Sequence, residues 1–129
     1  FADLCAKAGI DCIFLIAPTT KTARIEKIAQ AARGYLYYVS VKGVTGAGNL
    51  DVEEVNRKLE TIRKLTDLPI TVGFGIKDAA TARLIGEKAD GVVVGSALVN
   101  LVAQNQNDLP ALQSRIAELM QSLRQGLDQ

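Results

Sequence analysis

The sequence lacks histidine and tryptophan altogether, and among its 129 residues it has only two cysteines and one methionine. Histidine is the commonest general base of enzymes, the usual partner of a nucleophilic serine or cysteine, and a frequent zinc ligand. Its absence therefore excludes Ser-His and Cys-His catalysis and most zinc sites, and we expect no metal centre. Any chemistry of this chain must use other groups.

An excess of charge of one sign is also lacking, since 15 lysines and arginines balance 14 aspartates and glutamates. Without a basic surplus, no strong positive field attracts nucleic acid. No apolar run approaches the length of about 18 residues that a membrane span requires, and the first residues do not resemble a signal peptide. We therefore expect a cytoplasmic protein without nucleic-acid or membrane partners.

The chain is short for a closed eight-stranded α/β barrel, which usually needs about 250 residues. With 48% apolar and 22% charged residues, it has the composition of a globular domain. It begins at Phe1 rather than at methionine, and within a helical pattern, so we expect a fragment whose residues 1–129 form a single partial domain. Cys5 and Cys12 lie in apolar sequence without CxxC spacing, so we expect two buried, reduced thiols.

Apolar and partly β-branched segments predict four strands, at residues 12–17, 36–41, 70–74 and 92–94. Apolar residues at helical spacing predict helices near residues 1–8, 22–34, 51–65, 78–85, 97–103 and 110–123. Thr22, Asp51 and Asp78 are the expected N-caps, and Gly9 is an expected left-handed C-cap. Pro110 is expected in the first turn of the last helix.

This alternation of strands and helices predicts an α/β fold with parallel strands. Because crossovers between parallel strands are right-handed, the strands should lie side by side in one sheet with the helices outside. Four such units make either an open doubly wound sheet or half of a closed (β/α)8 barrel.

Glycines follow the last three predicted strands, and ligands of parallel α/β folds bind at the carboxyl ends of strands. Glycine lets backbone N–H groups approach a ligand, and a helix N-terminus adds partial positive charge, so such loops suit a phosphate dianion. Each glycine alone is better explained by a tight turn, and the spacing in residues 43–48 matches neither the dinucleotide fingerprint nor the P-loop. The candidates are Gly46, Gly73, Gly75, Gly95 and the hydroxyl-bearing Ser96.

No pair of carboxylates is well placed for proton transfer. Asp11 and Asp90 directly precede strands, at the end of the sheet away from a ligand. Asp51 and Asp78 are explained as helix caps, and most glutamates lie on helix faces. The chain alone therefore resembles a phosphate anchor without an acid–base pair.

Three side chains near the ligand edge each have two interpretations. Lys42 follows a strand and is either a Schiff-base nucleophile or an ordinary solvated lysine. Side-chain alternation places Tyr37 on the opposite face from Tyr38, where it either contacts an aromatic ligand or packs in the core. The same two interpretations apply to Phe74.

Four motifs follow one another along the chain: IFLIAPTT at residues 13–20, YYVSVKGVTGA at 37–47, DLPITVGFGI at 67–76 and DGVVVGSALV at 90–99. Together they closely resemble the tryptophan synthase alpha chain family, and GVTGA ahead of GFGI is the most specific part. The resemblance implies the second half of a TIM (β/α)8 barrel, strands five to eight. It also implies retro-aldol cleavage of indole-3-glycerol phosphate to indole and glyceraldehyde 3-phosphate in tryptophan biosynthesis, without cofactor or metal.

The resemblance also assigns roles to individual positions. In the family, backbone groups at positions that match Gly46, Gly75, Gly95 and Ser96 hold the phosphate. The other matching positions are Thr45 in a loop that closes the site, Tyr37 near the catalytic carboxylate, and Leu15 and Phe74 near the indole and phosphate pocket. The family's catalytic glutamate and aspartate belong to the first half of the barrel. Nothing in this sequence matches them, so we expect the isolated chain to be inactive.

The resemblance implies a tryptophan synthase beta subunit as partner, because the family acts in an α2β2 complex that passes indole to that subunit. A four-strand piece also has two unpaired edges, so we expect it to bind the missing N-terminal half of the barrel or to self-associate. Two alternatives remain. One is another phosphate-binding barrel enzyme, of the thiamine-phosphate synthase or indole-glycerol-phosphate synthase type, and the other is a non-catalytic phosphate-binding half-barrel.

Overall fold

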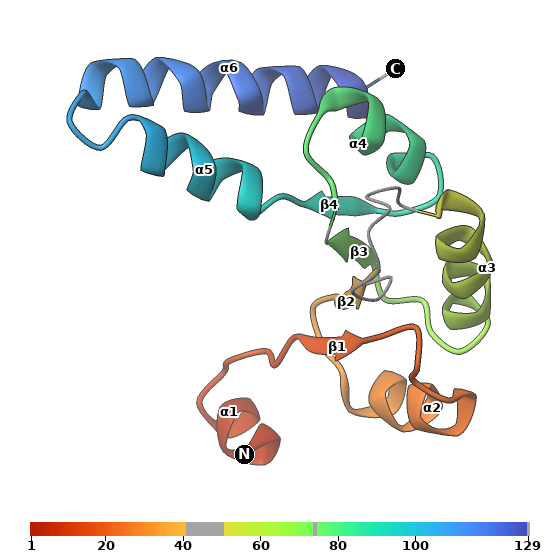
Figure 1. The fold of residues 1–129 in the computed structure, drawn as a ribbon. Helices are drawn as coiled ribbons and strands as arrows, with labels where there is room; N and C mark the ends of the chain where they lie inside the picture. The colour runs from red at the N-terminus through yellow and green to blue at the C-terminus, as the bar shows by residue number, and fades with distance from the viewer. Residues whose placement is uncertain (41–50, 74, 129) are drawn as a thin grey trace.

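The computed structural model describes residues 1–40, 51–73 and 75–128. Strands and helices alternate along most of the chain (Figure 1). The strands are β1 (Phe14–Ile16), β2 (Leu36–Val39), β3 (Ile70–Gly73) and β4 (Gly91–Val93). The helices are α1 (Ala2–Lys7), α2 (Thr22–Ala31), α3 (Val52–Arg63), α4 (Ala79–Gly86), α5 (Ser96–Gln104) and α6 (Leu109–Leu127).

The four strands form one parallel sheet in the order β1-β2-β3-β4, so each strand pairs with the next one along the chain. This confirms the predicted α/β fold with parallel strands. The register places Leu15, Tyr37, Thr71 and Gly91 in one row across the sheet. Because side chains alternate along a strand, the residues of this row share one face, and their strand neighbours share the other.

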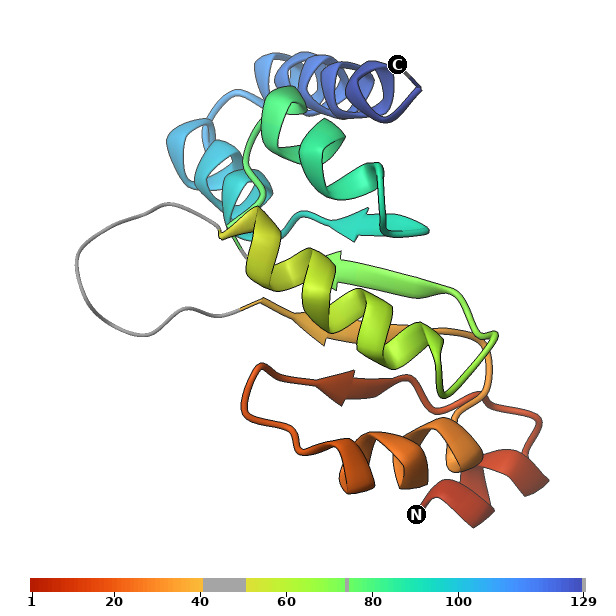
Figure 2. The ribbon, with the colours of Figure 1, turned by 90° about the vertical axis from the view of Figure 1, so that its right-hand side faces the viewer.

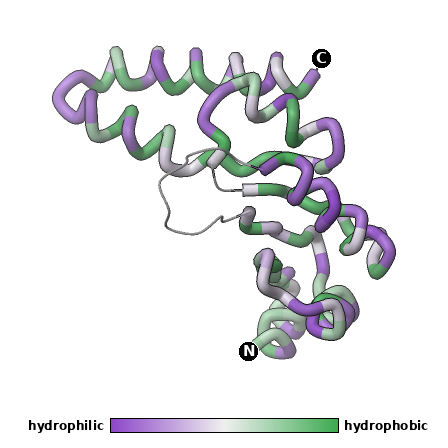
Figure 3. Tube along the Cα trace, turned by 45° about the vertical axis from the view of Figure 1, so that its right-hand side comes forward, coloured by the Kyte–Doolittle hydropathy of each residue, from purple (hydrophilic) through white to green (hydrophobic). Residues whose placement is uncertain are grey.

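One face of the sheet is covered by helices. In Figures 1 and 2, α2, α3 and α4 all lie on the same side of the strands. The strand residues on that side are almost completely buried: Ile16, Leu36, Tyr38, Ile70 and Val72. They form the core together with residues of α2, α3 and α4. Figure 3 shows hydrophobic residues in the strands, and both hydrophobic and hydrophilic residues along each helix.

The opposite face is open within the described part of the chain. Leu15 is 62% exposed there, although the continuous apolar run around it predicts a strand covered on both faces. Tyr37 and Thr71, its neighbours in the same row, are half-buried. Strand β1 therefore carries an apolar side chain on a face that no described element covers.

Helix starts mostly follow the predicted caps. The Asp51 carboxylate accepts a hydrogen bond from the Glu54 N–H at 3.0 Å, and that of Asp78 accepts one from the Thr81 N–H at 2.8 Å. Pro110 lies in the first turn of α6 as predicted. The prediction for Thr22 is wrong, because extended Lys21 occupies the N-cap of α2 and makes no side-chain cap.

The first helix forms where it was predicted but does not bury its apolar stripe. Gly9 follows it with φ +71°, which confirms the left-handed turn expected there. Phe1 and Leu4 are 94% and 68% exposed, and α1 contains no buried residue. Cys5 and Cys12 are half-buried rather than buried, so the prediction of two buried thiols is wrong.

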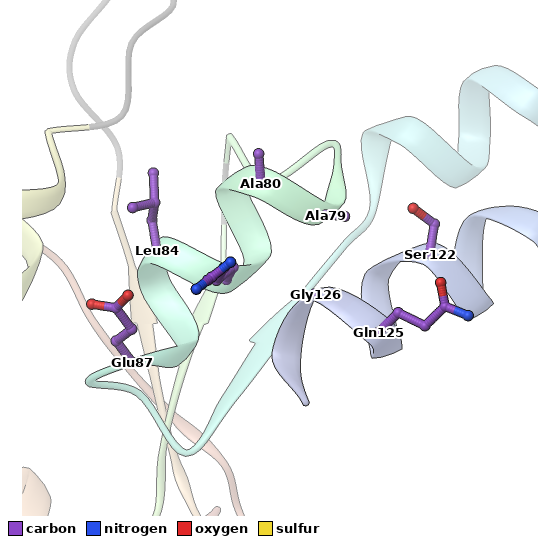
Figure 4. A pocket seen from close by; sticks show the side chains of 8 residues that line it. Ala79, Ala80, Leu84, Glu87, Ser122, Gln125 and Gly126 are labelled. Atoms are coloured by element: carbon purple, nitrogen blue, oxygen red, sulfur yellow. The ribbon is translucent and has the colours of Figure 1, made fainter. Parts of the chain in front are cut away.

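The outer layer is tightest where α4 meets α6. A β-carbon added at Gly126 would lie 2.6 Å from the backbone oxygen of Ala79, so glycine is required for this approach. Beside the contact lies a groove of about 580 Å³. Its lining includes Leu84 of α4, Glu87 at the C-cap of α4, and Gln125 of α6 (Figure 4). Among the described residues, no helix combines the length and apolar character needed to cross a membrane.

Candidate functional site

The carboxyl ends of all four strands lie at one edge of the sheet, because the strands are parallel and in register. The segments that follow are residues 17–21 after β1, Ser40 after β2, Gly75 after β3 and Gly95 after β4. This edge therefore gathers most of the described residues that the sequence singles out. Lys42, Thr45, Gly46 and Phe74 lie outside the described residues.

The turn from β4 into α5 presents bare backbone. Gly95 is the N-cap residue, with φ −114° and ψ −69°, and it offers no side chain to cap the helix. Ser96 opens α5, and both residues are exposed. The first amide groups of a helix have no partner within the helix and point out of its positive end, so this turn can accept an anion.

The space at Gly95 is open. A β-carbon added there would have no neighbour within 4 Å in the described chain, and the conformation at φ −114° is available to any residue. The fold alone therefore does not require glycine at this position. A requirement for close approach of a ligand to the backbone would explain it.

Two glycines lie at the end of β3, and each position favours glycine for a different reason. Gly75 has φ +79°, a left-handed conformation that side chains rarely adopt. Gly73 has no such requirement, but a β-carbon on it would overlap the phenol ring of Tyr37. The Tyr37 ring therefore lies over the backbone of β3 on the open face, at the carboxyl end of the sheet.

Ser40 locks β2 to β3 at this same end. Its backbone N–H and its hydroxyl both donate to the Gly73 carbonyl oxygen, each at 3.0 Å, and the residue is buried. Ser40 was not predicted from the sequence. The signal available was a lone hydroxyl residue at the end of an otherwise apolar and aromatic run.

A cleft of about 670 Å³ lies beside the carboxyl end of β1. Its apolar wall consists of Leu15, Ala17 and Val39, and its polar rim includes the cationic side chains of Lys21 and Arg24. Leu15, which the family resemblance places near the indole and phosphate pocket, is one of the residues that line this cleft. The two cations were not predicted, because helix-start residues without a motif carry no functional signal in a single sequence.

Lys58 of α3 holds the loop that borders this cleft. Its ammonium group donates to the carbonyl oxygen of Thr20 at 2.7 Å and to that of Pro18 at 3.3 Å. Within the loop, the Thr20 hydroxyl accepts a hydrogen bond from the Ala17 N–H at 3.0 Å. The loop after β1 is therefore fixed both internally and to the helix layer.

Three ionisable side chains, those of Asp78, Tyr38 and Asp90, have structural roles. Hydrogen bonds from Thr81 lower the pKa of Asp78, and burial followed by the charge of Glu54 raises the pKa of Tyr38. Asp90 accepts from the Ile70 N–H and from Arg63, each at 2.8 Å, at the amino end of the sheet as predicted. The described residues include no cluster of three or more metal-ligating side chains.

A sequence profile of the tryptophan synthase alpha chain family matches residues 1–128. The chain is 51% identical over 128 residues to the tryptophan synthase alpha chain of Methylococcus capsulatus, covering 99% of this chain and 48% of the relative. It is 52% identical over 120 residues to that of Thioalkalivibrio sulfidiphilus, covering 93% and 45%. The chain thus spans about half the length of the curated relatives it matches.

Solved structures agree with the sequence comparison. An Aquifex aeolicus protein superposes with a TM-score of 0.83 at 37% identity, over 98% of this chain and 44% of its own. Tryptophan synthase subunit alpha from Legionella pneumophila superposes with a TM-score of 0.77 at 36% identity, over 98% and 46%. The four parallel strands and alternating helices are half of a TIM barrel, as in these structures.

Proposed function

The chain belongs to the tryptophan synthase alpha chain family, and we propose that it supplies the phosphate-binding second half of a barrel lyase, strands five to eight. The reaction of the complete barrel is retro-aldol cleavage of indole-3-glycerol phosphate to indole and glyceraldehyde 3-phosphate. The observation that carries the proposal is the turn from β4 into α5. It exposes backbone amides at a helix N-terminus, with a glycine that the fold itself does not need.

Further residues at the same edge support a site for the phosphate. The left-handed Gly75 follows β3, the neighbour of β4, and the Ser96 hydroxyl stands at the start of α5. We propose that Gly75, Gly95, Ser96 and Gly46 together hold the phosphate, that Gly73 also contributes to this site, and that Thr45 helps to close the site. A phosphate dianion suits such a site, because backbone donors and the positive end of a helix dipole both favour a bound anion.

The open face supports a site for the apolar part of the substrate. Leu15, Ala17 and Val39 line the cleft at the end of β1, and the Tyr37 ring lies on the same face. We propose that Leu15, Tyr37 and Phe74 contact the indole ring. An aromatic ring buried against aliphatic side chains gains on the order of 1.5–3 kcal/mol from removal of apolar surface from water.

The acid and base of the reaction come, in this proposal, from the other half of the barrel. Of the described carboxylates, Asp51 and Asp78 cap helices and Asp90 stands at the amino end of the sheet. We therefore expect no turnover by the isolated chain. The proposed partners are the first half of the barrel, or a second copy on the open edges, and a tryptophan synthase beta subunit in an α2β2 assembly.

The test is a binding titration with glycerol phosphate on a complete barrel, in which this chain follows the complementary half of the Methylococcus capsulatus relative. Gly95→Asp places a negative charge about 4 Å from the dianion, which costs roughly 4 kcal/mol at an effective dielectric near 20, or about a thousandfold in affinity. Ser96→Ala removes one donor to a charged acceptor and should weaken binding about ten- to a hundredfold.

Gly95→Ala is the matched control, because its methyl group meets nothing within 4 Å of the described chain. If backbone approach matters, this variant binds less well than the parent but much better than Gly95→Asp. All variants must first be shown to be folded by circular dichroism. Equal and negligible losses in all three variants would mean that Gly95 and Ser96 serve only the turn.

A further inference from the structure

One lysine of the helix layer reaches across the molecule to the loop after β1. Lys58 of α3 is half-buried, and its ammonium group donates to the carbonyl oxygens of Thr20, at 2.7 Å, and of Pro18, at 3.3 Å. These bonds span 38 and 40 positions of sequence. The described residues supply no other donor to either carbonyl oxygen. Lys58 is therefore the hydrogen-bonding tie between this loop and α3.

The other hydrogen bonds of the loop stay within it. The Thr20 N–H donates to the Ala17 carbonyl oxygen at 2.9 Å, and the Thr20 hydroxyl accepts from the Ala17 N–H at 3.0 Å. Both bonds close the turn on itself and attach it to nothing else. An ordered lysine side chain loses rotamer freedom, and its positive charge strengthens the bonds that it donates. The position of the loop relative to the helices thus depends largely on Lys58.

The same loop forms one side of the cleft at the carboxyl end of β1. Four of the residues that line the cleft belong to the loop: Ala17, Thr19, Thr20 and Lys21. Pro18, in the middle of the loop, instead lines a second hollow of about 330 Å³, together with Lys58. Lys58 is not among the residues that line the cleft, so it holds the loop from the side of α3 and can act on a ligand only through the loop.

We propose that Lys58 is a positioning residue for the aromatic part of the substrate. It keeps the loop in the conformation in which Ala17, with Leu15 of β1, forms the wall that receives the ring. This inference rests on the proposed use of the cleft for the indole ring and adds the residue that fixes the shape of the cleft. Without the tie, the loop also adopts other conformations, and the affinity falls in proportion to the fraction of molecules in the binding conformation.

The phosphate end of the site should not depend on Lys58. Gly75 follows β3 and Gly95 follows β4, whereas the loop held by Lys58 follows β1, at the opposite edge of the sheet. A loosened loop after β1 leaves those two turns in place. Removing Lys58 should therefore weaken binding of an aromatic probe and spare a phosphate probe. A general loss of stability would weaken both.

The experiment titrates the complete barrel of the phosphate test with indole and, separately, with glycerol phosphate, by calorimetry. Lys58→Met keeps an unbranched side chain and removes the charge and the donors. It should bind indole about tenfold less tightly, which corresponds to a loop with the binding conformation in about one tenth of the molecules. Its affinity for glycerol phosphate should stay within about twofold of the parent value. Lys58→Gln should show the same split.

Hydrogen exchange of backbone amides tests the tie without any ligand. The amides of Ala17 and Thr20 should exchange at least about tenfold faster in Lys58→Met than in the parent barrel, because opening of the loop exposes both. Exchange at the start of α5 should not change. Unchanged exchange at Ala17 and Thr20 would mean that Lys58 does not hold the loop and would overturn the inference.

Arg63→Met and Lys58→Arg are the matched controls, and circular dichroism checks that every variant is folded. Arg63 lies in the same helix but donates to the Lys88 carbonyl oxygen, at 2.9 Å, and to Asp90, at 2.8 Å, at the amino end of the sheet. Arg63→Met should leave the affinity for indole within about twofold. Lys58→Arg keeps a cationic donor and should recover most of the affinity that Lys58→Met loses.

The outcomes separate this inference from the proposed function. Unchanged affinity for indole in Lys58→Met, an equal loss in Arg63→Met, or equal weakening of both probes would overturn the role of Lys58 alone. If the parent barrel bound glycerol phosphate but not indole, the proposed indole site would fail and this inference with it. If it bound indole but not glycerol phosphate, the phosphate proposal would fail, and the comparison of the Lys58 variants would still decide the role of Lys58.

Discussion

The two faces of the sheet differ although the same four strands build both. On the helix-covered face, Leu36 of β2 has no exposed surface, whereas on the other face Leu15 of β1 is 62% exposed. The strands therefore carry apolar residues for two cores, and the described helices complete only one. Within a parallel sheet that is half of a TIM barrel, the second core is the barrel interior.

The two ends of the strands also differ. At the amino end, side chains and backbone are paired in fixed bonds, as in the Asp90 contacts with Ile70 and Arg63. At the carboxyl end, Gly75 and Gly95 leave backbone exposed. The accessible backbone donors therefore lie at the carboxyl end, which is where ligand sites of barrels are built, and Ser40 ties β2 to β3 beside them.

The strongest test of the two faces compares one substitution on each. Leu36→Ala removes a side chain that is fully buried under the helices and should lower the free energy of unfolding by about 2–5 kcal/mol. Leu15→Ala removes a side chain that is mostly exposed and should lower it by less than about 1 kcal/mol. Urea denaturation followed by circular dichroism measures both. Equal losses would show that a second copy or another partner already covers the open face.

A second, smaller loss of stability is expected from replacing glycines that are in close contact with neighbouring atoms. The size of the loss depends on whether those atoms can move away. Gly126→Ala places its methyl group 2.6 Å from the Ala79 carbonyl oxygen, and backbone cannot move aside, so we expect a loss of about 1–3 kcal/mol. Gly73→Ala meets only the end of the Tyr37 side chain, which can swing into open space on the uncovered face. Its cost should be below about 1 kcal/mol.

The measurement for both glycines is thermal or urea unfolding, with tyrosine near-ultraviolet circular dichroism as a second signal. Gly73→Ala should change that spectrum because the Tyr37 ring moves, and Gly126→Ala should change it little. A loss at Gly73 as large as that at Gly126 would contradict the idea that the open face has room.

Periodicity in the sequence predicted much of the fold for a physical reason. The spacing of apolar residues differs between strands and helices and indicates which surfaces are buried. The N-caps at Asp51 and Asp78 could be predicted because each carboxylate accepts a hydrogen bond from a residue only three positions away. Thr22 failed as a cap because hydroxyl residues are common at loop ends, and the neighbouring Thr20 closes the loop instead. Strand ends were predicted less well, since β1 begins at Phe14 rather than at Cys12.

The site could be predicted only where backbone conformation decides it. Glycines after strands indicated the turns at Gly75 and Gly95. Of the two, only Gly75, at φ +79°, has a backbone conformation that favours glycine. Lys58 and Ser40 act across 38 and 33 positions of sequence, through contacts that a single sequence does not encode locally.

The last comparison concerns the start of α4, one of the helices that complete the covered face. The Asp78 carboxylate accepts hydrogen bonds from the N–H and the hydroxyl of Thr81, at 2.8 and 2.6 Å, and these bonds lower its pKa below the ordinary value of 3.8. Asp78→Ala removes the cap and should lower the free energy of unfolding by about 1 kcal/mol at neutral pH.

The pH dependence of that loss identifies the charge as its source. Because the pKa of Asp78 is lower in the folded chain than in the unfolded chain, its stabilisation is complete well above pH 3.8 and is lost as the pH falls through the lowered value. The difference between parent and Asp78→Ala should therefore shrink in acid, in urea titrations from pH 7 down to the acid limit of folding. Asp78→Asn keeps an acceptor at the cap without a titrating charge, so the difference between Asp78→Asn and Asp78→Ala should stay constant with pH. If the difference in free energy of unfolding between the parent and Asp78→Ala also stayed constant with pH, the carboxylate would contribute only as a hydrogen-bond acceptor. Its negative charge would then not stabilise the start of α4.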